Sequence, residues 1–142
     1  NLDPEPELPA EIVRWNELVD REHIIDHGGN AELVMPMPRP VWADPDYDII
    51  GVNRGQCYYN SAWVAVPVAY SSGGVKGSLF EPANMRVRAK LCGDGTAIIG
   101  LSRRSVNIKN KWEWSEGVGL TPAEATELAR VLLAAVDLIG ER

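Results

Sequence analysis

Apolar and cationic residues alternate across residues 85–91, and this alternation constrains the fold more than any other feature of the sequence. The apolar members are Met85, Val87, Ala89 and Leu91, and the cationic members are Arg86, Arg88 and Lys90. Successive side chains of a β-strand point to opposite faces, so the pattern predicts a strand with one apolar and one cationic face. The glycines of residues 93–95 are typical of a hairpin turn, which predicts that residues 96–102 return as an antiparallel strand.

Other stretches also have the composition of β-strands. Residues 106–114 alternate again, with Val106, Ile108, Trp112 and Trp114 on one side and Asn107, Lys109, Lys111 and Glu113 on the other. Residues 56–70 form the longest run rich in aromatic and β-branched side chains, and Pro67 indicates an edge strand or a bulge there. The apolar stretches 31–37 and 49–52 are predicted to be brief strands.

The C-terminal segment carries the clearest helix signals. Thr121 suits the N-cap position, Pro122 suits the first helical position, and Glu124 completes a capping box. Apolar residues then fill most positions up to Gly140, which suits the C-terminal stop. Such a wide apolar stripe predicts burial on more than one side, one side against the sheet and the other against the N-terminal helix or a second copy.

Strands grouped in the middle of the chain, rather than alternating with helices, predict an α+β fold. We expect a mainly antiparallel sheet of about five to six strands, with an N-terminal helix over 9–25 and a C-terminal helix packed on it. Residues 1–8 are acidic and proline-rich and are expected to form a flexible arm. Residues 9–142 are expected to form one domain, because 142 residues match the size of a single domain.

Charge is segregated along the chain, although the net charge is only −6. Residues 1–50 hold 3 Lys/Arg against 12 Asp/Glu, residues 51–114 hold 9 against 3, and residues 115–142 hold 2 against 5. This asymmetry favours a charged partner. The alternative is that the acidic and basic parts face each other within one fold.

Cys57 and Cys92 are too few for a zinc site, and both lie in predicted strands, where an unpaired cysteine behaves as a small buried hydrophobe. We therefore expect two free thiols, which favours the cytoplasm, while a disulfide between them is the alternative. The longest unbroken apolar runs are about six residues, whereas a membrane-spanning helix needs roughly 18. No signal-peptide pattern is visible, and we expect no membrane association.

The residue types that usually carry catalysis or bind metals form no complete constellation. His23 and His27 lie four positions apart, but the intervening glutamate of a zinc-protease motif is missing. The D-x-D-x-D run that starts at Asp44 lacks the glycine and glutamate of a calcium-binding loop, and no histidine lies near Cys57 in the sequence. We therefore expect no metal, no cofactor and no enzymatic activity, and an enzyme of unknown type is the third alternative for the function.

Two surfaces are candidates for binding. The cationic residues of the predicted sheet are Arg86, Arg88, Lys90, Lys109 and Lys111. A basic sheet with nearby aromatic side chains can follow a phosphate backbone and stack bases, although the same pattern describes a solvated sheet that resists edge pairing. The other candidate is the second apolar flank of the C-terminal helix, formed by Val131, Ala134 and Leu138.

The segment between Val106 and Glu124 resembles part of the ββββα single-stranded-DNA-binding transcriptional coactivators, which are grouped in fold with whirly and Pur-type proteins. The resembling residues are Val106-Asn107-Ile108-Lys109-Asn110-Lys111-Trp112, Ser115-Glu116-Gly117 and Val118-Gly119-Leu120-Thr121-Pro122-Ala123-Glu124. That family joins an aromatic-bearing strand to a capped helix through a turn. The resemblance covers only the C-terminal third of the chain. It implies a dimer, with a nucleic-acid strand contacted by Lys109, Lys111, Arg86 and Arg88.

The absence of a catalytic constellation, the broadly apolar last helix and a surplus of Trp favour a small non-enzymatic binding or regulatory module. We expect it to act through protein–protein contacts and to self-associate as a homo-oligomer. The alternative is a single-stranded nucleic-acid-binding protein that uses the cationic face of the sheet.

Overall fold

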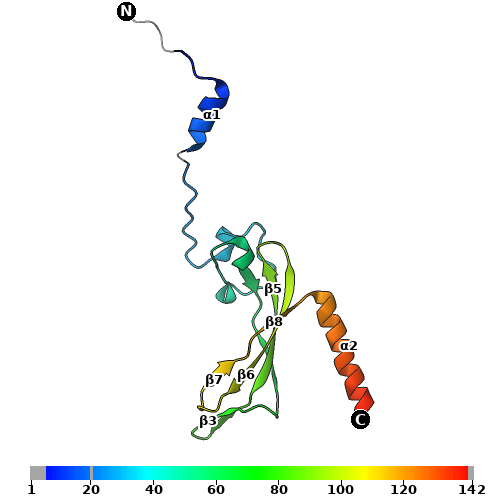
Figure 1. Ribbon diagram of the computed structural model, residues 1–142. Helices are drawn as coiled ribbons and strands as arrows, with labels where there is room; N and C mark the ends of the chain where they lie inside the picture. The colour runs from blue at the N-terminus through cyan, green and yellow to red at the C-terminus, as the bar shows by residue number, and fades with distance from the viewer. Residues whose placement is uncertain (1–5, 20, 141–142) are drawn as a thin grey trace, which may run out of the picture.

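The computed structural model describes residues 6–19 and 21–140 and confirms the α+β fold (Figure 1). The helices are α1 (Ala10–Val19) and α2 (Pro122–Ile139), with 3-10 helices η1 (Ala31–Leu33), η2 (Pro45–Tyr47) and η3 (Arg54–Gln56) between α1 and the sheet. The strands are β1 (Tyr58–Asn60), β2 (Val64–Pro67), β3 (Gly74–Lys76), β4 (Leu79–Glu81), β5 (Asn84–Cys92), β6 (Ala97–Val106), β7 (Trp112–Trp114) and β8 (Val118–Leu120). Residues 1–5 of the expected N-terminal arm lie outside the described part of the chain.

The central hairpin of the sheet consists of β5 and β6, as the alternation of residues 85–91 predicted. Gly95 in its turn has a φ of +90°, a conformation that suits glycine because it has no Cβ. β1 and β2 both pair with β5, and β7 and β8 both pair with β6, in antiparallel register throughout. The result is a meander in which each outer strand is interrupted once, while β3 and β4 form a separate small hairpin.

The two faces of the central hairpin differ as predicted. Val87 is paired with Leu101, and both line the space beneath α2 together with Leu120. The apolar face of β5 and β6 is therefore turned toward α2. Arg86 and Arg88 alternate with Val87 along β5, so their side chains project from the opposite face of the sheet.

The buried core lies where η1 packs on β1, and not beneath α2. Ala31, Met35, Cys57 and Tyr59 form a buried apolar cluster, and Tyr59 is completely buried. The Tyr59 hydroxyl donates a hydrogen bond to the carbonyl of Met37 at 2.8 Å. The expectation of two free, buried thiols at Cys57 and Cys92 is confirmed.

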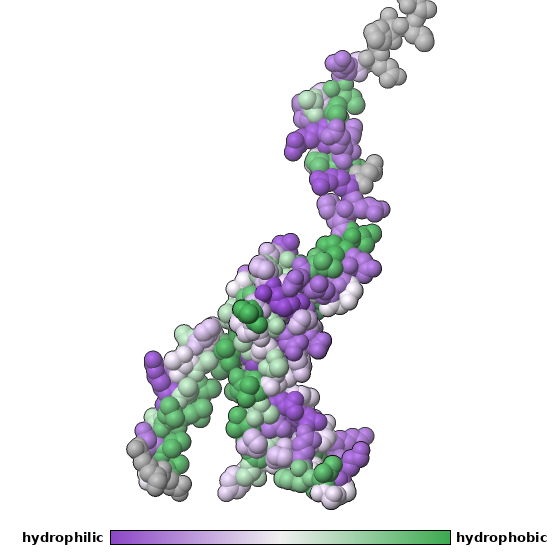
Figure 2. All heavy atoms as spheres, turned by 180° about the vertical axis from the view of Figure 1, so that it is seen from behind, coloured by the Kyte–Doolittle hydropathy of each residue, from purple (hydrophilic) through white to green (hydrophobic). Residues whose placement is uncertain are grey.

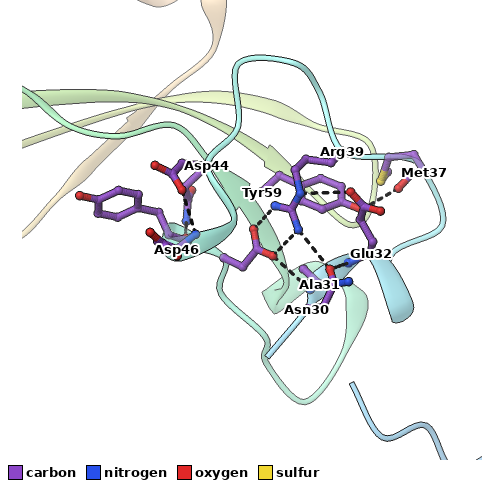
Figure 3. A network of polar contacts seen from close by, with 11 residues as sticks. Asn30, Ala31, Glu32, Met37, Arg39, Asp44, Asp46 and Tyr59 are labelled. Atoms are coloured by element: carbon purple, nitrogen blue, oxygen red, sulfur yellow. Dashed lines mark hydrogen bonds and ion pairs between the residues drawn. The ribbon is translucent and has the colours of Figure 1, made fainter. Parts of the chain in front are cut away.

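An ion pair between Arg39 and Asp48 lies beside this core. Figure 3 shows Arg39 close to Glu32 and Tyr59. The exposed fractions of the two side chains are only 11% and 2%. The Asp48 carboxylate also accepts a hydrogen bond from the backbone N–H of Ala31 at 3.1 Å. The Arg39 guanidinium donates to Glu32 at 3.1 Å and lies 4.8 Å from the centre of the Tyr59 ring. The acidic run that begins at Asp44 therefore ends in a buried structural carboxylate.

The N-terminal helix is shorter than the predicted range 9–25, because α1 ends at Val19 and residues 21–25 are not helical. Figure 1 shows α1 standing away from the sheet, and no residue of α1 is buried. Short helices are marginally stable in water without tertiary packing. The apolar side chains among residues 21–25 are exposed and have no surface to pack against, so nothing stabilises a longer helix.

The stretches 31–37 and 49–52 were predicted as strands, and the structure corrects both predictions. Residues 31–33 form η1, because the Asn30 side chain caps this turn by accepting a hydrogen bond from the Glu32 N–H at 3.0 Å. The stretch 49–52 contributes only a single β-bridge between Ile49 and Tyr58.

Two predicted long strands are each interrupted. The run 56–70 splits into β1 and β2 at Ser61. The Ser61 backbone N–H donates to the Ala89 carbonyl, and the Ser61 hydroxyl oxygen, in place of a backbone carbonyl, accepts a hydrogen bond from the Ala89 N–H. Pro67 lies in β2, which pairs only with β5 among the described strands, so the predicted edge position is confirmed. The run 106–114 turns at residues 107–110, where Asn110 adopts a φ of +58°, and only β7 continues it.

The helix α2 begins as predicted, with the complete capping box of Thr121 and Glu124 and with Gly140 in the left-handed conformation at its end. Its packing differs from the prediction, however, because no residue of α2 is buried. Figure 1 shows α2 leaving the sheet at an angle, and Figure 2 shows apolar side chains gathered along α2 and the neighbouring surface of the sheet. The expected burial on more than one side is therefore not achieved within one chain.

Candidate functional site

The cationic face of the sheet is built by β5. Arg86, Arg88 and Lys90 occupy every second position of this strand and share the face that points away from α2. Neighbouring cations on the strand are two residues apart, which corresponds to about 6.8 Å. The alternation in the sequence therefore becomes a regular row of three positive charges on one surface.

Each of these cations is stacked on an aromatic ring. The guanidinium of Arg88 lies 4.0 Å from the centre of the Trp63 ring, and that of Arg86 lies 5.0 Å from the Trp114 ring. The two tryptophan rings are 5.7 Å apart and inclined by 34°. We call Arg88, Trp63, Trp114 and Arg86 the cation–aromatic ladder. Lys90 extends the row, with its ammonium 4.3 Å from the centre of the Tyr58 ring.

Strand pairing explains how the ladder forms from distant residues. Trp63 lies in the interruption between β1 and β2, which flank β5, and Trp114 ends β7 on the far side of β6. Both rings therefore reach over the central hairpin from opposite edges. Sequence reasoning missed the contact of these tryptophans with the arginines, because the contact requires the pairing of β5 and β6 with their outer neighbours.

No carboxylate neutralises the row in the part of the chain that the structure describes. Arg86 donates through Nε to the amide oxygen of Asn84 at 2.9 Å, whereas Arg88 and Lys90 form no ion pair. Arg104, further along the same face, differs because it is paired with Glu81 at 2.6 Å. The charge of Arg86, Arg88 and Lys90 is thus available to an anion from solution.

A hollow of about 370 Å³ lies beside Arg88 and Lys90, and Trp63, Trp114 and Ser102 also line it. Gly100 lies beneath the two cations: a Cβ there would come within 3.2 Å of Lys90 Cδ and 3.6 Å of Arg88 Cγ. Two buried donor atoms have no hydrogen-bond partner in the structure, Nε of Arg88 and Oγ of Ser102. The hollow therefore contains positive charge and unused hydrogen-bonding capacity.

Burial disfavours the charged forms of two cations in the row. Burial lowers the pKa of Arg88, because desolvation penalises the charged form. Burial also lowers the pKa of Lys90, and the adjacent charge of Arg88 lowers it further. A bound anion would relieve both effects, since it would supply the opposite charge that this face lacks.

Lys109 and Lys111 do not belong to the row. Both lie at the turn between β6 and β7, where their backbone N–H groups donate to the Asn107 side chain at 2.9 and 3.1 Å. Their side chains are exposed at this end of the sheet. The expected cluster of five cations is therefore a row of three on the sheet face with two lysines in a separate turn.

A second candidate surface lies between α2 and the sheet. An apolar cleft of about 220 Å³ is lined by Val87, Ile99 and Leu101 from the sheet and by Leu128 and Leu132 from α2. The predicted interface residues are Val131, Ala134 and Leu138. Val131 and Leu138 have exposed fractions of 55% and 88%, and Ala134 is exposed as well. By helical spacing these three residues lie on a flank of α2 beside the stripe that lines the cleft.

The remaining candidates from the sequence form no site. His27 accepts a hydrogen bond from the Gly29 N–H at 2.9 Å through Nδ1, and Asp44 caps η2. Among the described residues, no group of three or more His, Cys, Asp or Glu side chains is arranged to hold a metal ion. Within the same residues, every helix falls short of the length and apolarity that a bilayer-spanning helix requires.

Comparisons of the chain with protein-family models, with curated proteins and with solved structures found no match.

Proposed function

We propose that this protein is a small non-enzymatic binding module that associates with a second copy of itself through α2. The observation that carries the proposal is the exposure of this helix: it is apolar at most positions, and none of its residues is buried. Exposed apolar patches of more than a few hundred Å² are rare in monomers and usually mark an interface.

The total surface of the chain supports this proposal. Its accessible area is 11243 Å², whereas a compact monomer of 15.6 kDa exposes about 7,200 Å². The excess is roughly 4,000 Å², part of which belongs to α1, whereas a standard interface needs about 800 Å² from each partner. Residues 21–26 are exposed as well and contribute to this excess, so α2 supplies one part of it.

Self-complementarity favours a second copy as the occupant. Each chain offers both a projecting apolar helix and an open apolar cleft beside it. In a two-fold arrangement the helix of one copy covers the cleft of the other, and both surfaces are buried at once. By helical spacing Glu127 lies one turn before Val131 on the flank that carries Val131, Ala134 and Leu138, so the apolar part of this flank is its C-terminal half, from Val131 to Leu138.

The test is sedimentation equilibrium on the full chain. We expect a dimer for the wild type, and a monomer for the variant with Val131→Glu and Leu138→Glu, because both positions are exposed and the charges would be buried in the interface. Arg130→Glu, on the polar side of the same helix, is the matched control and should remain dimeric. A wild type that stays monomeric at high concentration, or a dimer that survives the double substitution, contradicts the proposal.

A second candidate function is the binding of single-stranded nucleic acid, and the observation that favours it is the row of Arg86, Arg88 and Lys90, each beside an aromatic ring. Three cations without acidic partners, spaced by about 6.8 Å, match the repeat of an extended phosphate backbone. Three phosphate contacts on a single strand correspond to a slope of about −2 in log K against log salt. Affinity should therefore fall about twentyfold between 50 and 200 mM salt.

Fluorescence anisotropy of labelled single-stranded DNA and RNA at these two salt concentrations tests this candidate. Substitution of Arg86 and Arg88 by Glu should abolish binding, whereas Arg103→Glu on the opposite face of β6 is the control and should leave most of it. Substitution of Lys109 and Lys111 should have the smaller effect, because they lie in the turn. Unchanged affinity after the Arg86 and Arg88 substitutions contradicts this function.

A further inference from the structure

We propose that the hollow beside Arg88 and Lys90 is a binding site for one phosphate group, held by the side chains of Arg88, Lys90 and Ser102. This inference makes the nucleic-acid candidate more specific, because it defines where one phosphate binds. It also applies to free phosphate, and it does not depend on self-association.

Two hydrogen-bond donors at the hollow are unused. Oγ of Ser102 and Nε of Arg88 are buried atoms without a hydrogen-bond partner, and the exposed fraction of Ser102 is only 7%. Buried polar groups in folded proteins are almost always hydrogen-bonded, so an unpartnered pair at one site points to an acceptor that the site is built to receive. Both residues line the same hollow, and they lie on adjacent, paired strands.

The two cations at the hollow are preorganised by aromatic rings. The contact with Trp63 restrains the Arg88 guanidinium, while its Nε has no hydrogen-bond partner. Tyr58 restrains the ammonium of Lys90 in a similar way. Because these long side chains are already ordered, less conformational entropy is lost when an anion binds. No carboxylate from the described residues competes for either cation.

The arrangement of the donors favours a tetrahedral anion. Guanidinium, ammonium and hydroxyl donors approach the hollow from different residues on two strands, β5 and β6. A tetrahedral oxyanion offers oxygens in several directions, whereas a carboxylate offers two oxygens in one plane. Phosphate therefore uses all three donors at once. The absence of a Cβ at Gly100 keeps the stems of Arg88 and Lys90 close to the sheet and the hollow open.

The cation–aromatic ladder also indicates which part of a nucleic acid this face would contact. The faces of Trp63 and Trp114 already contact guanidinium groups and each other, so they serve mainly to position the cations. A nucleic acid would then be held chiefly through its phosphates, with little preference among bases. Arg86, one cation further along β5, would contact the next phosphate of a strand but not an isolated ion.

The experiment measures binding of inorganic phosphate to the full chain in a phosphate-free buffer, by the line width of the ³¹P NMR signal, alongside the anisotropy of a labelled oligothymidylate. The variants are Ser102→Ala and Arg88→Gln, and Arg103→Gln on the opposite face is the charge-matched control. Hydrogen bonds to a charged group predict that Arg88→Gln weakens phosphate binding about tenfold or more. Ser102→Ala, which removes one hydroxyl and little volume, should weaken it severalfold, and the control should leave it unchanged.

Each outcome separates the two proposals for this face. Phosphate that binds the wild type, weakens in both variants and displaces the oligonucleotide supports the site. If inorganic phosphate binds in this way but the oligonucleotide does not, the phosphate site is supported and its ligand is a free phosphate. The nucleic-acid function is then contradicted. If the oligonucleotide binds but phosphate neither binds nor competes, or if Ser102→Ala and Arg88→Gln behave like the control, the site is overturned.

Discussion

The guanidinium of Arg88 lies 4.0 Å from the centre of the Trp63 ring, and no carboxylate in the described part of the chain pairs with it. An aromatic face is a weaker partner than a carboxylate, and it leaves the charge of the guanidinium largely unneutralised. The contact therefore orders the cation and keeps it available. Arg104 shows the contrast, because it stacks on Trp112 at 4.1 Å but is also paired with Glu81.

Substitution Trp63→Leu should weaken both the fold and the cationic face. Loss of the ring that stacks on Arg88 and Trp114 is expected to lower the free energy of unfolding by about 1–2 kcal/mol. Urea denaturation measures this change. Trp15→Leu in α1 is the control, because Trp15 is exposed and should change stability little. Equal effects of the two substitutions would show that the ladder contributes no specific stability.

Substitution Arg39→Met should be among the most destabilising single changes in this chain. It leaves the Asp48 carboxylate buried without its partner, and the expected loss is about 3 kcal/mol or more in the free energy of unfolding. Arg130→Met removes an exposed i,i+3 pair with Glu127 and should cost less than about 0.5 kcal/mol. The double variant Arg39→Met with Asp48→Leu should recover part of the loss, and the idea fails if it is no more stable than Arg39→Met.

The titration of Lys90 should appear in the pH dependence of stability. Its pKa in the folded chain lies below the ordinary value of 10.5 because of burial and the charge of Arg88. Between these two values the unfolded chain binds more protons, so this group makes stability rise as pH increases through that alkaline window. Tyr58 beneath it acts in the opposite direction, since burial raises its pKa and favours the neutral form in the fold.

Comparison with Lys90→Met isolates the lysine from the tyrosine. We expect the variant to be more stable than the wild type at neutral pH, with the difference shrinking as the pH rises toward 10.5, because the wild-type lysine then loses its charge. Thermal denaturation at a series of pH values measures this difference. A variant that is less stable at neutral pH would mean that the stacking on Tyr58 outweighs the desolvation of the charge.

The midpoint of thermal unfolding should depend on protein concentration, because association through α2 stabilises the folded chain by mass action. Leu132→Ala should lower the midpoint and weaken its concentration dependence, since Leu132 lines the cleft between α2 and the sheet. Differential scanning calorimetry over a hundredfold range of concentration provides the measurement. A midpoint that is constant over this range argues against an α2 interface.

Local signals in the sequence were sufficient for the parts of the fold that local interactions control. The β5–β6 hairpin follows from strict alternation and a glycine turn, and the start of α2 follows from the capping box of Thr121 and Glu124. The cationic face was predicted for the same reason, because alternation along one strand decides which side chains share a face.

Long-range contacts decided the remainder. The burial of Asp48 depends on Arg39 and on the backbone of Ala31, and nothing in a D-x-D-x-D run distinguishes it from a solvated turn. The contact between Arg88 and Trp63 requires the pairing of β2 with β5, and the shared hollow with Ser102 requires the pairing of β5 with β6. Alternation specifies the face on which a residue lies, but its partners depend on strand order and register, which are set by the packing of the whole chain.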